Sequence, residues 1–302
     1  MRARLLTAFA AVYLVWGSTY LAIRFAVETL PPLLMAGARF VLAGAILLAW
    51  ARFREGSPLP SRSEWRVGLI TGTLLLLGGN GGVAWAEQRV PSGVAALLVA
   101  VVPLWMVLLE WLRPGGQRPR MPVFLGVGIG LSGLALLVGP AAISQGGSDT
   151  TGAIVLILAS LSWAAGSLYA KWAPGGASGT SVAGTQMFAG GVVLLVAGVI
   201  ARELSQLDLA HASTRSLLGF AYLVTIGSLI GFTAYLYLLA HTSAAKASTY
   251  AYVNPVVAVF LGWAIGHEKV TSRTIIAAAI ILAGVAIITI TRDSATISPS
   301  DP

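Results

Sequence analysis

The chain has 302 residues, of which 57% are hydrophobic and only 10% charged, and its mean hydropathy is +0.84. Soluble domains carry roughly a quarter charged residues, so this composition argues against a water-soluble fold. The formal charge is +8, and the basic residues lie at the ends of apolar segments. This distribution is typical of membrane topology and not of nucleic-acid binding. Without cysteine the chain has no disulfide framework, thiolate metal site or catalytic thiol, and we predict neither metal nor cofactor.

Apolar segments of helix-spanning length follow one another along almost the whole chain. A bilayer core of about 30 Å is crossed by roughly 20 apolar residues in a helix. The expected fold class is therefore all-α integral membrane protein with ten transmembrane helices. The spans are predicted at residues 6–26, 33–51, 67–86, 93–112, 122–139, 152–171, 182–200, 216–239, 245–265 and 273–291.

The positive charges predict the orientation, because cytoplasmic loops retain Lys and Arg. In the first half, Arg89 alone lies in the loops opposite the amino terminus. The second half is nearly balanced, so its direction depends on the even number of spans, and both termini are expected in the cytoplasm. The arginines on the amino-terminal side are Arg2, Arg4, Arg52, Arg54, Arg62, Arg66, Arg113, Arg118 and Arg120.

The two halves of the chain match each other. Trp16 recurs 147 positions later as Trp163, and Pro103 recurs 152 positions later as Pro255. Five spans per copy is an odd number, so the second copy crosses the membrane in the opposite sense, and such inverted repeats hold their site at the interface near the midplane. The predicted division is a first five-helix repeat, a linker, a second repeat and a cytoplasmic tail, at 1–139, 140–151, 152–291 and 292–302.

Prolines and glycines interrupt the spans at matched places. Pro103 and Pro255 each lie about ten residues into a span, where proline removes a backbone hydrogen bond and bends the helix. Two interpretations stay open for them, a gate or hinge beside a substrate and a kink that serves packing. Small-xxx-small steps predict close helix contacts, and they fall at Gly68/Gly72, Gly78/Gly82, Gly126/Gly130 and Gly227/Gly231.

Two stretches resemble the EamA branch of the drug/metabolite transporter superfamily: WGSTYLAIR at 16–24 and HTSAAKASTYAYVNPVVAVFLGWAIGHEKVT at 241–271. The resemblance covers almost the whole chain. It implies ten helices in two inverted repeats, a cavity lined mainly by the first, third, fourth, sixth, eighth and ninth helices, and export of amino acids or similar metabolites across the bacterial inner membrane. One departure is that Glu268 follows Pro255 by 13 residues, whereas Gly116 stands at that distance from Pro103.

Aromatic, amide and hydroxyl side chains occur on the helices that the resemblance places around the cavity. Such groups suit a neutral or zwitterionic solute with an apolar body. Ordinary core packing is the alternative for each of them. The predicted substrate-binding residues are Trp16, Tyr20, Asn80, Trp85, Trp163, Ser167, Tyr235, Tyr250 and Asn254.

Charged residues inside a membrane are costly and therefore suggest function. Arg39 lies about two turns inside the second span, where it forms a structural pair or contacts a substrate or gate. No span carries an acid near its middle, which argues against the mechanism of small multidrug exporters. Facilitated efflux and proton antiport both stay open, and Glu87 is the best residue for proton coupling.

Other functions fit the sequence less well than a small-molecule exporter embedded in a lipid bilayer. A broader drug or nucleotide-sugar-like carrier would share the same fold. A membrane-embedded enzyme should show acids, histidines or a metal motif gathered at one face, and a scaffold would need no matched kinks. No nucleic-acid partner is expected, and the sequence does not indicate an oligomeric state.

Overall fold

The computed structural model describes residues 2–113, 121–138, 149–173, 178–241 and 250–296, which form helices and no strand. Among these residues, seven helical stretches are long and apolar enough to cross a membrane, and three shorter ones are also apolar. The long stretches are Ala3–Ala26, Pro32–Phe53, Arg62–Ala86, Ser92–Leu112, Thr150–Trp172, Gly179–Ile200 and Thr214–Leu238; the shorter ones are Met121–Gly133, Val253–Ala264 and Ser272–Gly284.

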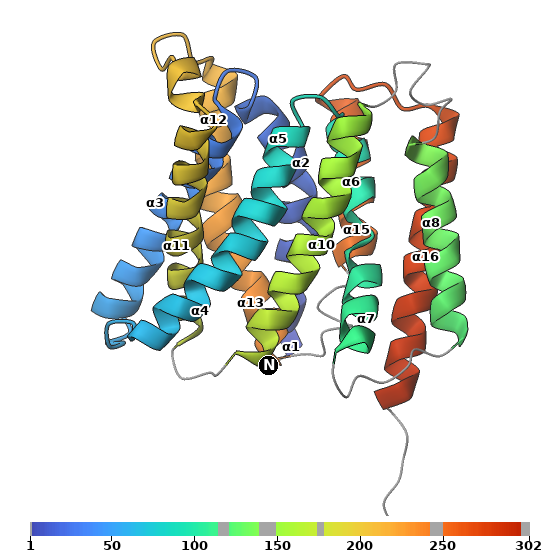
Figure 1. The fold of residues 1–302 in the computed structure, drawn as a ribbon, viewed down its shortest axis with the longest axis horizontal. Coiled ribbons are helices and arrows are strands. Elements are labelled where there is room, and N and C mark those ends of the chain that lie inside the picture. The colour runs from blue at the N-terminus through green and yellow to red at the C-terminus, as the bar shows by residue number, and fades with distance from the viewer. Residues whose placement is uncertain (1, 114–120, 139–148, 174–177, 242–249, 297–302) are drawn as a thin grey trace, which may run out of the picture.

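Several of these stretches contain more than one helical type (Figure 1). The first half comprises α1 (Arg2–Ala11), the π-helix η1 (Val12–Trp16), α2 (Gly17–Ala26), α3 (Pro32–Phe53), α4 (Arg62–Gly72), the π-helix η2 (Thr73–Gly81), α5 (Gly82–Ala86), α6 (Ser92–Val99), α7 (Val102–Leu112) and α8 (Met121–Val138). The second comprises α10 (Thr150–Trp172), α11 (Gly179–Ile200), the 3-10 helix η3 (Glu203–Gln206), α12 (Thr214–Tyr222), the π-helix η4 (Leu223–Phe232), α13 (Thr233–His241), α15 (Tyr250–Ala264) and α16 (Ser272–Thr296).

Polar side chains fix where helices begin. Ser61 and Glu64 form a capping box at the start of α4, with the Ser61 N–H 2.6 Å from the Glu64 carboxylate. Asp149 caps α10 by accepting from the N–H groups of Thr151 and Gly152. These backbone hydrogen bonds, Gly152 first, hold the pKa of Asp149 below its ordinary value because they stabilise the charged carboxylate.

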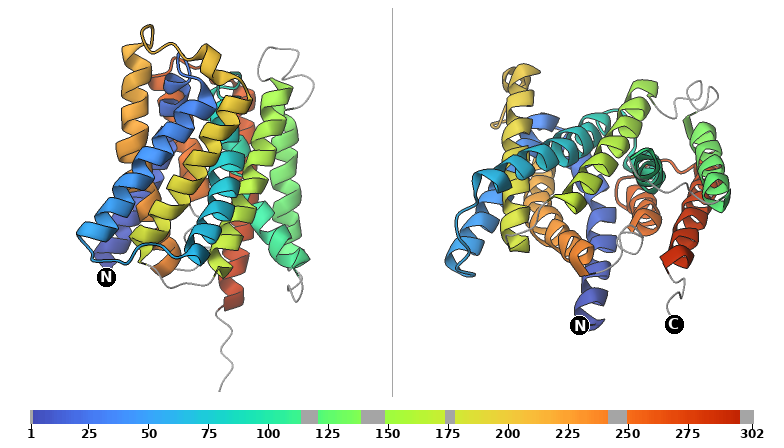
Figure 2. Two further views of the ribbon diagram at one scale, coloured as in Figure 1. Left: turned by 60° about the vertical axis from the view of Figure 1, so that its left-hand side comes forward. Right: turned by 60° about the horizontal axis from the view of Figure 1, so that its bottom comes forward.

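The two halves run in opposite directions. In Figure 1, α1 starts at the lower face and α10 at the upper face, and the carboxyl end of α16 returns to the lower face beside the amino terminus. Helices at equivalent places in the two halves pack against each other, namely α3 on α11, α6 on α15 and α8 on α16. Figure 2 shows α8 and α16 as a neighbouring pair at one edge of the bundle. The packing between η2 and α10 is likewise mirrored by that between η1 and η4.

Glycines allow the closest of these contacts, at positions outside the predicted small-xxx-small steps as well as within them. A Cβ atom on Gly44 of α3 would lie 2.4 Å from the backbone nitrogen of Phe188 on α11. One on Gly284 of α16 would lie 2.5 Å from the nitrogen of Gly130 on α8. Neither gap can hold a methyl group, so the backbones meet directly.

The two prolines occupy different places. Pro103 is the second residue of α7, after a break at Ala100 and Val101 that separates α7 from α6. It begins a helix instead of bending one, and at such a position its missing N–H costs nothing. Pro255 does lie inside α15. The last helix, α16, runs on to Thr296, beyond the predicted end of the tenth span at residue 291. Most of the expected linker at 140–151 lies outside the described residues.

Candidate substrate-binding cavity

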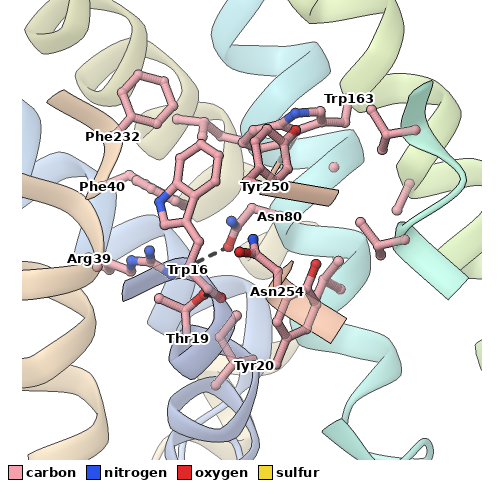
Figure 3. Close-up of a pocket in the computed structure, with 18 residues that line it drawn as sticks. Trp16, Thr19, Tyr20, Arg39, Phe40, Asn80, Trp163, Phe232, Tyr250 and Asn254 are labelled. Carbon is pink, nitrogen blue, oxygen red and sulfur yellow. Dashed lines mark hydrogen bonds between the residues drawn. The ribbon is translucent and has the colours of Figure 1, made fainter. Parts of the chain in front are cut away.

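A cavity of about 70 Å³ lies between helices of both halves (Figure 3). Its walls come from η1, α2, α3, η2, α5, α6 and α7 in the first half and from α10, η4 and α15 in the second. The lining residues are Trp16, Thr19, Tyr20, Ile23, Arg39, Phe40, Leu76, Gly79, Asn80, Val83, Val99, Val102, Ala159, Trp163, Gly227, Phe232, Tyr250 and Asn254.

Four rings from four segments, which we call the aromatic cluster, pack together at one side of the cavity: Trp16, Trp163, Tyr235 and Tyr250. The ring centre of Trp16 lies 4.8 Å from that of Tyr235, 5.2 Å from Tyr250 and 5.6 Å from Trp163. The rings of Trp163 and Tyr250 stand nearly perpendicular to that of Trp16, the edge-to-face geometry that aromatic pairs favour. Tyr235 backs the cluster without lining the cavity, and its hydroxyl lies 3.5 Å from Ser167 Oγ.

Arg39 forms the polar side of the cavity. Its side chain comes from α3 and is 3% exposed. Nε donates to the hydroxyl of Ser228 at 2.8 Å, and Nη1 lies 3.4 Å from Oδ1 of Asn80. Figure 3 shows this guanidinium directed toward Asn80.

The three π-helices all border the cavity, and π-helical turns inside α-helices occur frequently at functional sites. Trp16 ends η1, Asn80 lies in η2, and Ser228 lies in η4. Glycines of these segments make room for the rings. A Cβ on Gly231 would lie 2.6 Å from Trp16 Nε1, and one on Gly79 would lie 2.9 Å from Trp163.

Asn254 joins the two halves beside the aromatic cluster. With its amide nitrogen turned toward the neighbouring carbonyls, it donates to the backbone oxygens of Tyr250 at 3.2 Å and of Tyr13 at 3.1 Å. Both donors of the amide are then used, and only Oδ1 is left for a ligand. The structure therefore gives Asn254 a positioning role in addition to its place in the lining.

Some predicted residues lie away from the cavity. Trp85 stacks against Arg89, whose guanidinium carbon lies 4.6 Å from the centre of the tryptophan ring. Pro255 faces a separate apolar groove between α15 and α16, and Pro103 lines neither space. Glu87 is fully buried just after α5, where its carboxylate oxygens have no hydrogen-bond partner among the described residues.

Among the polar and aromatic residues that line or support the cavity, sequence reasoning missed four: Thr19, Phe40, Ser228 and Phe232. The resemblance directed attention away from the second helix, so Phe40 escaped although it adjoins Arg39. The glycines between Gly78 and Gly82 surround Asn80, and they could have indicated an irregular helix at η2. Ser228 and Phe232 carry no distinguishing pattern in so apolar a segment.

A bundle of apolar helices in two oppositely directed halves, with an aromatic and cationic cavity between them, defines a membrane transporter. The sequence matches the EamA-like transporter family over residues 4–139 and 150–290. The chain therefore belongs to the EamA family, as the motifs predicted.

Two relatives agree with this assignment, and a solved structure shares the fold. The chain is 41% identical over 289 residues to the "Uncharacterized inner membrane transporter YedA" of Escherichia coli K12, covering 94% of this chain and 90% of the relative. It is 28% identical to the "Uncharacterized transporter YoaV" of Bacillus subtilis, covering 91% and 93% of the two chains. A solved structure titled "Crystal structure of protein" shares the fold with a TM-score of 0.66 at 21% identity, over 96% of this chain and 98% of the other.

Proposed function

We propose that the protein exports amino acids or related small metabolites across the bacterial inner membrane by alternating access. The observation that carries this proposal is the aromatic cluster, which draws rings from both halves at the interface between them. Transporters built from inverted repeats bind substrate at such an interface and rock one half against the other.

The small volume of the cavity supports a moving mechanism. A volume of about 70 Å³ holds a few water molecules, whereas small-molecule pockets commonly measure about 300–1,000 Å³. A metabolite of the proposed class therefore fits only when the lining moves apart. Among the described residues the lining contains no Asp or Glu, so a cationic drug would find no counter-charge there.

The topology belongs to the same proposal. We propose ten spans, made of the seven long stretches and the three shorter apolar helices, in inverted repeats over 1–139 and 152–291 with a linker and a tail as predicted. Both termini lie in the cytoplasm in this arrangement. The start of α1 and the end of α16 both lie at the lower face in Figure 1, which supports an even number of spans.

The test is flux of radiolabelled metabolites through purified protein in sealed proteoliposomes. The panel contains aromatic, aliphatic, hydroxylated and acidic compounds. We expect Trp163→Ala to lower flux about tenfold, because aromatic pairs contribute about 0.5–1.5 kcal/mol each and this variant loses contacts with two partners. Trp172→Ala is the matched control, since Trp172 lies at the end of α10 and is 42% exposed. Equal effects of the two variants, or no flux of any compound, would refute the proposal.

A further inference from the structure

The guanidinium of Arg39 carries a charge that its surroundings leave unbalanced. The ion pairs of the described residues are Arg89–Asp149, Lys171–Glu110, His211–Asp208 and Arg215–Glu28, and none includes Arg39. Its partners, the Ser228 hydroxyl, the Asn80 amide oxygen and the ring of Phe40, whose centre lies 4.5 Å from the guanidinium carbon, are all uncharged. Neutral dipoles offset only part of the hydration that a buried cation loses. An anion beside Arg39 would therefore be strongly stabilised.

Donor groups of Arg39 remain free for such an anion. A guanidinium has five N–H groups, and the hydrogen bonds to Ser228 and Asn80 use one each from Nε and Nη1. One N–H on Nη1 and two on Nη2 are left. Gly227 passes beside Nη2 without a side chain, and a Cβ there would lie 3.2 Å from that nitrogen. The glycine keeps this side of the guanidinium uncovered.

We propose that Arg39 binds the carboxylate of the substrate, and that the substrate is a small monocarboxylate with an aromatic or apolar body. This inference rests on the proposed function of the same cavity. Arg39 is the charged residue of the lining, and one positive charge balances one carboxylate. The ammonium of a free amino acid would meet no carboxylate in this lining, so the cavity suits an acid without an amino group better.

The test compares four probes of similar size and different charge: 3-phenylpropionate, phenylalanine, 3-phenylpropylamine and 3-phenylpropanol. Binding to the purified full-length protein is measured by isothermal titration. We expect 3-phenylpropionate to bind most tightly, then phenylalanine, with the amine and the alcohol weakest. Arg39→Met should weaken 3-phenylpropionate binding about 10- to 100-fold, the loss expected for hydrogen bonds to a charged group, and leave the alcohol unchanged.

Two further variants separate binding from structure. Arg39→Lys keeps the charge and should retain part of the affinity for 3-phenylpropionate. Arg89→Met removes an arginine that is half exposed and far from the lining, and it should change nothing. The melting temperature of Arg39→Met should equal or exceed that of the wild type, because an apolar side chain replaces a buried cation without a carboxylate partner.

Several results would overturn the inference. Tight binding of the amine or alcohol, unchanged 3-phenylpropionate binding in Arg39→Met, or a markedly lower melting temperature of that variant would each do so. If the wild type transports another class of compound without preferring carboxylates, the role of Arg39 fails and the proposed function stands. If the wild type neither binds a probe nor moves any compound of the flux panel, both fail.

Discussion

Two tryptophans matched by the repeat, Trp16 and Trp163, meet at the centre of the molecule, and each lies against a glycine of the other half. Gly231 adjoins Trp16 and Gly79 adjoins Trp163. The rings therefore belong to the interface between the halves and not to the core of either one. A movement of one half against the other changes the contacts of both rings at once, which makes them suitable for both binding and gating.

Glu87 is the residue on which proton coupling would depend. Arg24 donates from Nη1 to its backbone carbonyl, while its buried carboxylate is acted on by the charges of Arg24 and Glu268. Glu268 itself accepts from the backbone N–H groups of Ser92 and Gly93 at the start of α6. Adding or removing a proton at Glu87 therefore alters the repulsion between two carboxylates. One follows α5, and the other, from the segment after α15, binds the start of α6.

We expect Glu87→Gln to abolish the stimulation of flux by an imposed pH gradient while substrate exchange without a gradient persists. The physical reason is that glutamine keeps the shape of the side chain and cannot titrate. Glu110→Gln is the control, because Glu110 forms its ion pair with Lys171 at a partly exposed end of the spans. Gradient-stimulated flux in Glu87→Gln, or indifference of the wild type to the gradient, would contradict a coupling role.

The sequence predicted several residues of the cavity lining, but not what the polar ones contact. Trp16, Trp163 and Tyr250 could be found because the repeat and the resemblance placed their helices around one space. Arg39 was left between pairing and substrate contact, since pairing depends on Ser228 and Asn80, which lie far from it in sequence. Trp85 was assigned to the site from its residue type and its helix, and its stacking on Arg89 depends on local geometry.

Among the elements, the tight crossing of α3 and α11 joins the two halves. Gly44 faces Phe188 there, and Gly184 and Gly191 approach Leu48 and Val41 in the same way. α3 also carries Arg39 into the cavity. The spacing of α3 from α11 therefore helps to set the position of the guanidinium.

We expect Gly44→Ala to lower the free energy of unfolding by about 1–3 kcal/mol, the usual cost of overpacking. Its Cβ would lie 2.4 Å from a backbone nitrogen that cannot rotate away. Gly128→Ala is the control, because a Cβ at Gly128 of α8 would meet nothing within 4 Å. Thermal unfolding in detergent measures both, and equal melting temperatures would contradict the close packing.

Helix positions followed from apolar length, but helix type did not. The third and eighth spans, at 67–86 and 216–239, were predicted as plain helices, and the structure places a π-helix in each of them. A π-helical turn depends on side chains packing from neighbouring helices, such as Ser162, whose hydroxyl donates to the carbonyl of Leu74 in η2 at 2.8 Å. Hydrophobic periodicity does not predict such contacts, because it describes one segment at a time.

For the whole molecule, the account joins three features: oppositely directed halves, a small cavity between them, and rings from both halves that line it. The repeat in the sequence was sufficient to predict the first feature. The size of the cavity was not predictable, because it depends on how the rings pack in three dimensions.

The most direct test of alternating access uses the absence of native cysteine from the chain. Thr19→Cys introduces one thiol in the cavity lining, and Ala84→Cys introduces one at a fully buried position outside the lining. A membrane-impermeant thiol reagent is applied to each face of oriented vesicles in turn. The account predicts that the thiol at position 19 reacts from both faces, that bound substrate slows both reactions, and that the thiol at position 84 stays unmodified. A thiol at position 19 that reacts from neither face, or from one face only, would contradict the account.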